Sequence, residues 1–107
     1  MTRPAIHPGE VLAEELEEIA VTPTALARQL RVPANRMTQI IQGKRAITGD
    51  TALRLGHWFG MSAQFWLNLQ SAYDIRVAGA TAGAEIKRLP KRRPMLTTGR
   101  NKQVATR

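Results

Sequence analysis

The chain has 107 residues, no cysteine and a formal net charge of +8. A chain of this length fits one domain with a modest core, and the lack of cysteine excludes disulfides and thiolate metal sites. No apolar run is long enough for a signal peptide or a membrane span. We therefore expect a cytoplasmic protein that has no membrane partner.

The charge is distributed unevenly along the chain. Five of the eight acidic residues lie in the first twenty positions, namely Glu10, Glu14, Glu15, Glu17 and Glu18. From residue 21 onward, fifteen Lys and Arg face three acidic residues, which gives this part a net charge of +12. A field of this sign attracts polyanions, and charge alone does not choose among DNA, RNA and anionic membranes.

Helical periodicity predicts an all-α chain of five helices without strands. The first helix opens at Pro8, a favourable first helical residue, and ends before Val21. The second begins at Pro23, after the N-cap Thr22, and ends before Pro33. The residues expected to face inward are Val11, Leu12, Leu16 and Ile19 in the first helix and Leu26, Ala27 and Leu30 in the second.

The third predicted helix spans 34–42 and stops at Gly43, which can adopt the left-handed C-cap conformation. Two more helices are predicted over 50–59, after the N-cap Thr48, and over 63–78, after the N-cap Ser62. The residues expected to face inward are Ala52, Leu55, Gly56 and Phe59 in the fourth helix and Phe65, Leu69 and Ala72 in the fifth.

The character of the chain changes after position 78. From Lys87 onward there are eight basic residues and no acidic one. Large apolar residues are too few there to form a separate core. We therefore expect a helical domain over 1–78 and a flexible basic tail over 79–107.

The second and third helices flank the short connector 31–33, which is the geometry of a helix-turn-helix. In this motif the second helix enters the major groove of DNA with its N-terminal part against the base edges. The outward face of the third helix is polar but uncharged, and amides and hydroxyls bond to bases without a charged partner. The predicted base-contacting residues are Ala34, Asn35, Thr38 and Gln39. The predicted phosphate-contacting residues are Arg36, Gln42, Lys44 and Arg45.

Four segments of the chain carry a family resemblance: HPGEVLAEEL, LARQLRVPANRMTQIIQGKRAIT, DTALRLGHWFG and QFWLNLQSAYD. Together they resemble HigA-type antitoxins of the lambda-repressor-like (XRE) helix-turn-helix family, over residues 6–78. The resemblance implies a five-helix lambda-repressor-like domain that dimerises and represses transcription at its own palindromic operator. It also implies a HigB/RelE-like ribonuclease toxin as protein partner, and association with the nucleoid through DNA.

Two features depart from the family pattern. Arg31 occupies the turn position where related motifs often have glycine, so a left-handed backbone there would be carried by a residue with a Cβ atom. The basic end of the chain after Glu85 also exceeds the core pattern of the family.

We predict no catalytic site, no metal site and no cofactor. His7 and His57 lie far apart in the sequence and lack Cys or carboxylate partners at metal-ligand spacing. The glutamates of the first helix have no nucleophile or phosphate-binding loop beside them, so a solvated helix face explains them better than acid–base chemistry. The chain is not expected to be an enzyme.

Two protein-binding surfaces are predicted. The acidic face of the first helix, with Glu14, Glu15 and Glu18, complements the positive surface with which an RNA-cleaving toxin holds RNA. Trp66 and Tyr73 lie seven residues apart and off the predicted inward stripe of the fifth helix. They suit a dimer interface, where aromatic residues are enriched.

Other interpretations of the same features stay open. In a plain helical bundle, the polar face of the third helix would only meet water. A free-standing phage- or plasmid-type repressor would have no toxin partner, and an RNA-binding or scaffolding module would use the basic tail. The tail itself is expected to contact the DNA backbone without base preference, to cover the acidic first helix, or to have no function.

Overall fold

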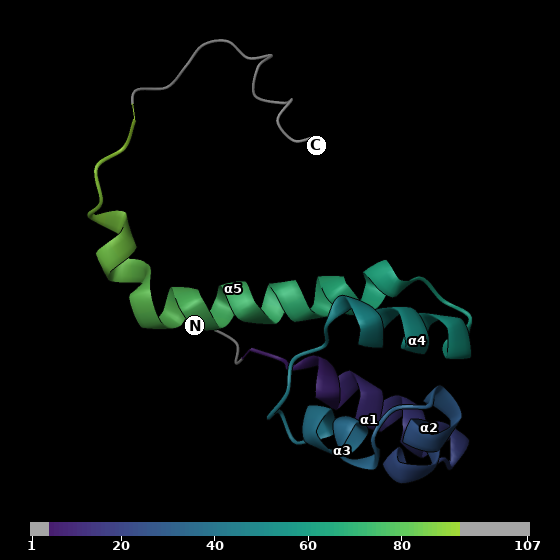
Figure 1. Cartoon of the computed structure of the whole chain (residues 1–107). Coiled ribbons are helices and arrows are strands. Elements are labelled where there is room, and N and C mark those ends of the chain that lie inside the picture. The colour runs from purple at the N-terminus through teal and green to yellow at the C-terminus, as the bar shows by residue number, and fades with distance from the viewer. Residues whose placement is uncertain (1–4, 93–107) are drawn as a thin grey trace, which may run out of the picture.

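The computed structural model describes residues 5–92, and this part of the chain contains five α-helices and no strand (Figure 1). The helices are α1 (Pro8–Ile19), α2 (Pro23–Leu30), α3 (Ala34–Ile41), α4 (Gly49–Phe59) and α5 (Ala63–Lys87). The predicted all-α fold is confirmed. Predictions about residues 93–107, which make up most of the basic tail, lie outside the described residues.

The helices begin within one residue of where the sequence predicts. Thr22, Thr48 and Ser62 each precede a helix, and their side-chain oxygens accept hydrogen bonds from the backbone N–H three residues later, at 3.1, 3.4 and 3.1 Å. Pro8 and Pro23 occupy the first positions of α1 and α2. These caps satisfy backbone donors that have no partner inside the helix, so local chemistry sets the starts.

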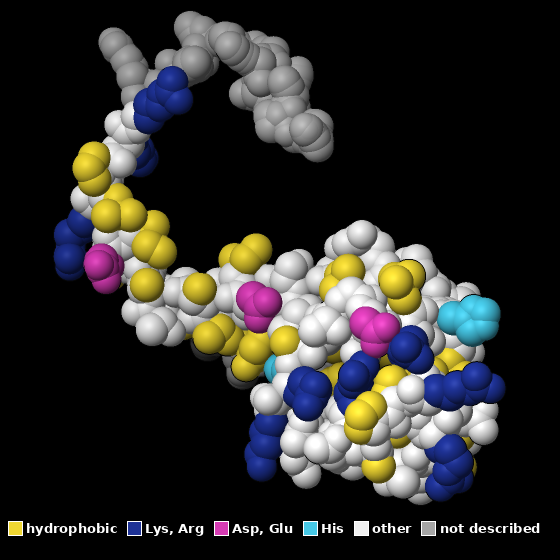
Figure 2. All heavy atoms as spheres, in the orientation of Figure 1, with side chains coloured by type: hydrophobic (Ala, Val, Ile, Leu, Met, Phe, Trp, Pro, Cys, Tyr) yellow, Lys and Arg dark blue, Asp and Glu magenta, His cyan; other side chains and the backbone are white. Residues whose placement is uncertain are grey.

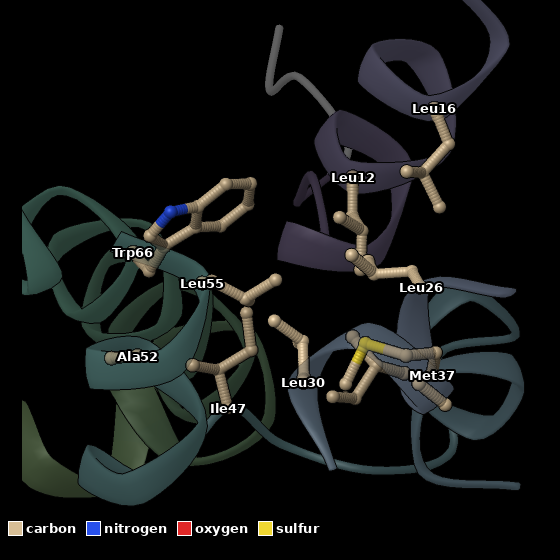
Figure 3. Packing of buried hydrophobic residues seen from close by; sticks show 11 residues of the cluster. Leu12, Leu16, Leu26, Leu30, Met37, Ile47, Ala52, Leu55 and Trp66 are labelled. Atoms are coloured by element: carbon tan, nitrogen blue, oxygen red, sulfur yellow. The ribbon is translucent and has the colours of Figure 1, made fainter. Parts of the chain in front are cut away.

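One apolar core lies among all five helices. Figure 3 shows side chains of α1, α2, α3, α4 and α5 converging on it, together with Ile47 from the loop before α4. The buried hydrophobic residues are Leu12, Leu16, Leu26, Ala27, Leu30, Met37, Ile40, Ile47, Ala52, Leu55 and Trp66. The prediction that Ile19 faces inward is wrong, because it is the last residue of α1 and lies exposed.

α5 buries a different face from the one that its sequence pattern predicts. Trp66 is 0% exposed and Gln70 is buried, whereas Phe65 is 38% exposed and Ala72 is exposed. Apolar side chains surround the first turns of this helix on several sides, so periodicity alone does not select the inner face. The prediction that Trp66 lies in a dimer interface is wrong, because none of its surface is left for a partner.

α5 is also longer than predicted, because it continues to Lys87 instead of ending near residue 78. Figure 1 shows its N-terminal part packed on the other helices and its C-terminal part extending away from them. Residues 79–87 are therefore helical, and the predicted domain boundary at 78/79 falls inside a continuous helix. No helix of the described residues combines the length and apolar content needed to cross a bilayer.

Candidate nucleic-acid interface

The turn between α2 and α3 is built on a left-handed residue. Arg31 has φ 59° and ψ 47°, which confirms the left-handed backbone expected at this position. The N–H of Val32 donates to the carbonyl of Ala27 at 3.0 Å and closes the end of α2. A non-glycine residue in this conformation costs about 1–2 kcal/mol, which the packing of α2 against α3 offsets. The short turn thereby fixes how α3 is presented.

α3 separates an apolar inner face from a polar outer face. Met37 and Ile40 are fully buried against the other helices. The Thr38 hydroxyl donates to the carbonyl of Asn35 at 3.1 Å, which restrains its side chain. The four predicted base-contacting residues all reach the surface: Ala34 and Asn35 are exposed, and Thr38 and Gln39 are half-buried. The structure therefore brings them together on one accessible helix face.

Gln39 is held by a residue outside the helix. The Nε–H of Arg45 donates to the amide Oε1 of Gln39 at 2.9 Å. Sequence reasoning assigned these two residues separate roles, one at a base and the other at a phosphate. The structure instead pairs their side chains at the exposed C-terminal end of α3.

The segment after α3 is anchored at both ends. Gly43 has φ +77°, as its predicted C-cap role requires, and the N–H of Lys44 returns to the Gln39 carbonyl at 2.8 Å. At the other end Ile47 is buried, and its N–H donates to Oε1 of Gln70 at 2.8 Å. Sequence reasoning missed Gln70, and its only sequence signal is a polar residue one turn after Trp66. The loop 42–48 between α3 and α4 carries Lys44 and Arg45 and is named the basic loop. The buried amide of Gln70 attaches this loop to the core.

Arg36 does not lie free for a phosphate. Its Nη1 pairs with Oδ2 of Asp50 at 2.9 Å, and its side chain is only 24% exposed. Asp50 also accepts from Nε of Arg54 at 3.0 Å. The hydrogen bond from Arg54 is the main cause that lowers the pKa of the Asp50 carboxyl, and the hydrogen bond from Arg36 lowers it further. The structure gives Arg36 a role between α3 and α4 that the predicted phosphate contact did not foresee.

The remaining predicted phosphate contacts, Gln42, Lys44 and Arg45, are exposed beside the polar face of α3. Figure 2 shows Lys and Arg side chains gathered over the end of the molecule that α1–α4 form, while apolar side chains lie along the extending part of α5. Positive charge and uncharged hydrogen-bonding groups thus share one region of the surface. This combination suits a polyanion whose bases are read through hydrogen bonds.

A second surface is formed by α1. Glu14, Glu15 and Glu18 are exposed on its outer side, as predicted. Beside them is an apolar hollow of about 440 Å³, which Glu17 borders. Its lining residues are Ala13, Leu16, Glu17, Ala20, Val21, Thr22, Pro23 and Ile41. The acidic face therefore adjoins a place where an apolar side chain of a partner can be held.

The start of α1 is fixed by His7. Its Nδ1 accepts from the N–H of Gly9 at 2.9 Å, while Glu10 accepts from the His7 N–H at 3.2 Å. Burial, the largest influence, lowers the pKa of His7, and the nearby carboxylates of Glu10 and Asp74 oppose this in part. The imidazole also packs edge-on against Tyr73, with ring centroids 4.7 Å apart. Half-buried Tyr73 thus joins α5 to the start of α1. Within residues 5–92, no three Asp, Glu, His or Cys side chains lie together in a way that could hold a metal ion.

Known proteins resemble the chain closely. A curated relative, virulence-associated protein I of Dichelobacter nodosus, is 51% identical over 76 residues, which cover 70% of each chain. The structure of an addiction module antidote protein of the HigA family from Coxiella burnetii is 47% identical, with a TM-score of 0.82 over 85% of this chain and 100% of that one. The Pseudomonas aeruginosa antitoxin HigA, solved with the higBA promoter, is 45% identical, with a TM-score of 0.78 over 86% and 99%. No family model matches.

The chain belongs to the HigA family of helix-turn-helix antitoxins. Members of the HigA family and their regulator relatives are not enzymes, and neither is this chain. The two aligned structures cover 85% and 86% of this HigA-family protein. Because residues 1–78 make up less than that share, the similarity continues beyond residue 78.

Proposed function

We propose that the chain binds its own palindromic operator as a dimer, represses transcription there, and neutralises a RelE-like ribonuclease toxin. The observation that carries the DNA-binding part is the outer face of α3. It presents Asn35, Thr38 and Gln39 on a helix that is fixed by the core on its other side. The Pseudomonas aeruginosa relative with the same fold was solved on promoter DNA.

In this proposal α3 lies in the major groove, with Asn35, Thr38 and Gln39 toward the bases. Amide side chains form paired hydrogen bonds with base edges, and each good pair discriminates by about 1–3 kcal/mol. Gln42 and Lys44 face the sugar-phosphate backbone, where they contribute affinity without sequence preference. Arg36 is left out of this set because Asp50 engages it.

The test compares substitutions of the two kinds. Gln39→Ala and Asn35→Ala should lower the preference for operator over random DNA while leaving much of the total affinity. Lys44→Ala should weaken binding to every sequence and reduce the logarithmic salt slope by about 0.9, the value for one phosphate contact. Binding is measured by fluorescence anisotropy at several salt concentrations. If both α3 variants keep the full operator preference, α3 is not the reading helix.

The dimer is proposed to form through the extending half of α5. Ile75 is 72% exposed and Ile86 is 53% exposed. Their spacing of eleven residues puts them on the same side of α5, whose C-terminal half leaves the core (Figure 1). A helical segment without tertiary packing is marginal in water, so this half of α5 needs a partner helix. Ile75→Glu with Ile86→Glu should give a monomer in analytical ultracentrifugation, and Val77→Glu on another side of α5 is the control. A dimer that survives the double substitution contradicts this interface.

The toxin is proposed to bind the acidic face of α1. A protein that cleaves RNA carries positive surface, which exposed glutamates complement, and the adjoining hollow can anchor an apolar side chain of that protein. Charge reversal at Glu14, Glu15 and Glu18 should slow association with a RelE-like toxin, and Ala13→Phe, which fills the hollow, should speed dissociation. Operator affinity is the control and should stay unchanged.

Two outcomes decide between the antitoxin and the alternative. If the neighbouring gene product does not bind the chain in co-purification, the free-standing repressor is the better description. If it binds, but with the same on-rate and affinity for all α1 variants, the toxin docks elsewhere.

The basic tail is proposed to add non-specific attraction to DNA, and deletion of 88–107 should then lower the salt slope while base preference persists.

A further inference from the structure

We propose that Arg45 acts in sequence recognition by orienting the amide of Gln39, and that the two side chains together read a guanine. The predicted role of Arg45 was a phosphate contact. This inference rests on the proposed function, since it assumes that the outer face of α3 meets base edges. It assigns a specificity role to a residue that lies outside the reading helix.

The first step is the orientation of the amide. The Nε–H of Arg45 lies 2.9 Å from Oε1 of Gln39, and a guanidinium can only donate. The group that faces Arg45 must therefore be the amide oxygen and not the amide nitrogen. A free glutamine presents either end of its amide to a base with similar ease, so the contact removes one of two alternatives before DNA arrives.

The second step is that Arg45 is itself held in place. The N–H of Lys44 is bonded to the Gln39 carbonyl at 2.8 Å, just before Arg45 in the chain. Just after it, Ile47 is buried and bonded to Gln70 of α5 at 2.8 Å. The backbone around Arg45 is thus fixed to α3 on one side and to the core on the other. Recognition groups held this way lose less entropy on binding.

The third step is the base. Once its Nε–H is engaged, Arg45 keeps the four N–H donors of its Nη groups, and Gln39 keeps the two N–H donors of Nε2. One lone pair of the Gln39 oxygen is already occupied. The pair is therefore rich in donors and poor in acceptors. In the major groove guanine presents the two acceptors N7 and O6 and no donor, whereas adenine presents a donor at N6.

Lys44 provides a matched comparison. It is the exposed neighbour of Arg45 and carries the same charge, but its ammonium makes no hydrogen bond with another side chain within residues 5–92. A phosphate contact needs only the charge, and both residues would serve equally. An orienting role needs the planar donor at one position, which only Arg45 supplies.

The experiment selects duplexes from a pool with randomised half-sites, using wild type, Gln39→Ala, Arg45→Lys, Arg45→Ala and Lys44→Ala. Wild type should prefer guanine at one position by roughly 5- to 150-fold, the range of one paired contact. Arg45→Lys keeps the charge and should lose that preference while the salt slope stays near wild type. Lys44→Ala should keep the preference. The double variant Gln39→Ala with Arg45→Ala should be no less selective at this position than either single variant.

The failures can be told apart. If Gln39→Ala keeps every base preference of the wild type, Gln39 reads no base and the inference falls. The proposed docking of α3 fails only if Asn35→Ala keeps the full preference as well. If Gln39→Ala loses a preference that Arg45→Lys and Arg45→Ala both keep, α3 reads DNA and the orienting role of Arg45 is overturned. A lost preference for adenine in place of guanine overturns the assignment of the base.

Discussion

α1 and α3 pack against each other, and both bury apolar side chains on their inner faces. Their outer faces differ in charge and in hydrogen-bonding groups. Leu12 and Leu16 of α1 enter the core in the same way as Met37 and Ile40 of α3. Outward, α1 presents glutamates and no cation, whereas α3 presents amides and a hydroxyl followed by a basic loop.

The difference shows where the information for function lies. The inner faces are interchangeable in chemistry, because the core asks only for apolar volume at helical spacing. Substitutions on the outer faces change the free energy of unfolding little. Each outer face can therefore carry the residues that suit a different partner. A variant that separates α1 from α3 should therefore disturb both surfaces, whereas a variant on one outer face should disturb only one.

The largest effect is expected where the two helices touch. A Cβ atom on Gly9 would overlap the backbone carbonyl of Ile40, which cannot move aside as a side chain can. Gly9→Ala should lower the free energy of unfolding by about 3 kcal/mol, the upper end of the usual cost of overpacking. Gly49→Ala is the control, since an added Cβ there meets open space. Urea unfolding measures both, and an unchanged Gly9→Ala midpoint contradicts the close contact.

The next effect concerns the loop that makes the α3 surface basic. Gln70→Leu removes the acceptor of the buried Ile47 N–H, and an unpaired buried donor costs about 1–3 kcal/mol. We expect the free energy of unfolding, measured in urea, to fall by about 2 kcal/mol. Operator preference should also be lost at a temperature below the melting transition, where the variant is still folded. Gln64→Leu, on an exposed part of α5, is the control. Full operator preference in Gln70→Leu would show that the loop holds its shape without α5.

A smaller effect is expected from pH at the start of α1. Burial lowers the pKa of His7 from its ordinary value of 6.5, and protonation of Nδ1 would remove the acceptor for Gly9. The unfolded chain then takes up a proton more readily than the folded one. The contribution of His7 to stability is complete above pH 6.5 and declines as the pH falls through 6.5 toward the lower folded value. In His7→Asn, which keeps a capping side chain, this part of the pH dependence of Tm should vanish.

The smallest effect is expected at Asp50, which holds the Arg36 side chain in an ion pair beside the face of α3 that is proposed to meet DNA. Exposed ion pairs contribute little, so Asp50→Asn should change Tm only slightly. It should however free Arg36 and raise non-specific DNA affinity more than Glu85→Gln, an exposed control with the same change of charge. Equal affinities for the two variants would mean that Arg36 stays unavailable without Asp50. Since the pKa of Asp50 is lowered, its pairing is present above pH 3.8 and is lost as the pH falls.

Much of the fold follows from local sequence. Thr22, Thr48 and Ser62 cap their helices, and Gly43 and Gly60 end theirs with positive φ. These features depend on interactions between residues a few positions apart, which a sequence records directly. The same holds for the polar face of α3, because helical spacing alone places its members together.

The tertiary structure decided which face of α5 is inside and how the site residues are paired. The start of α5 is apolar on several sides, so only its contacts with α1 and α4 selected Trp66 over Phe65 for the core. The pairs Arg36–Asp50, Arg45–Gln39 and Ile47–Gln70 join residues 14, 6 and 23 positions apart. Separations of this kind carry no periodic signal in the sequence. They exist because folding brings the start of α4 within reach of α3, and places the loop after α3 against α3 at one end and against α5 at the other.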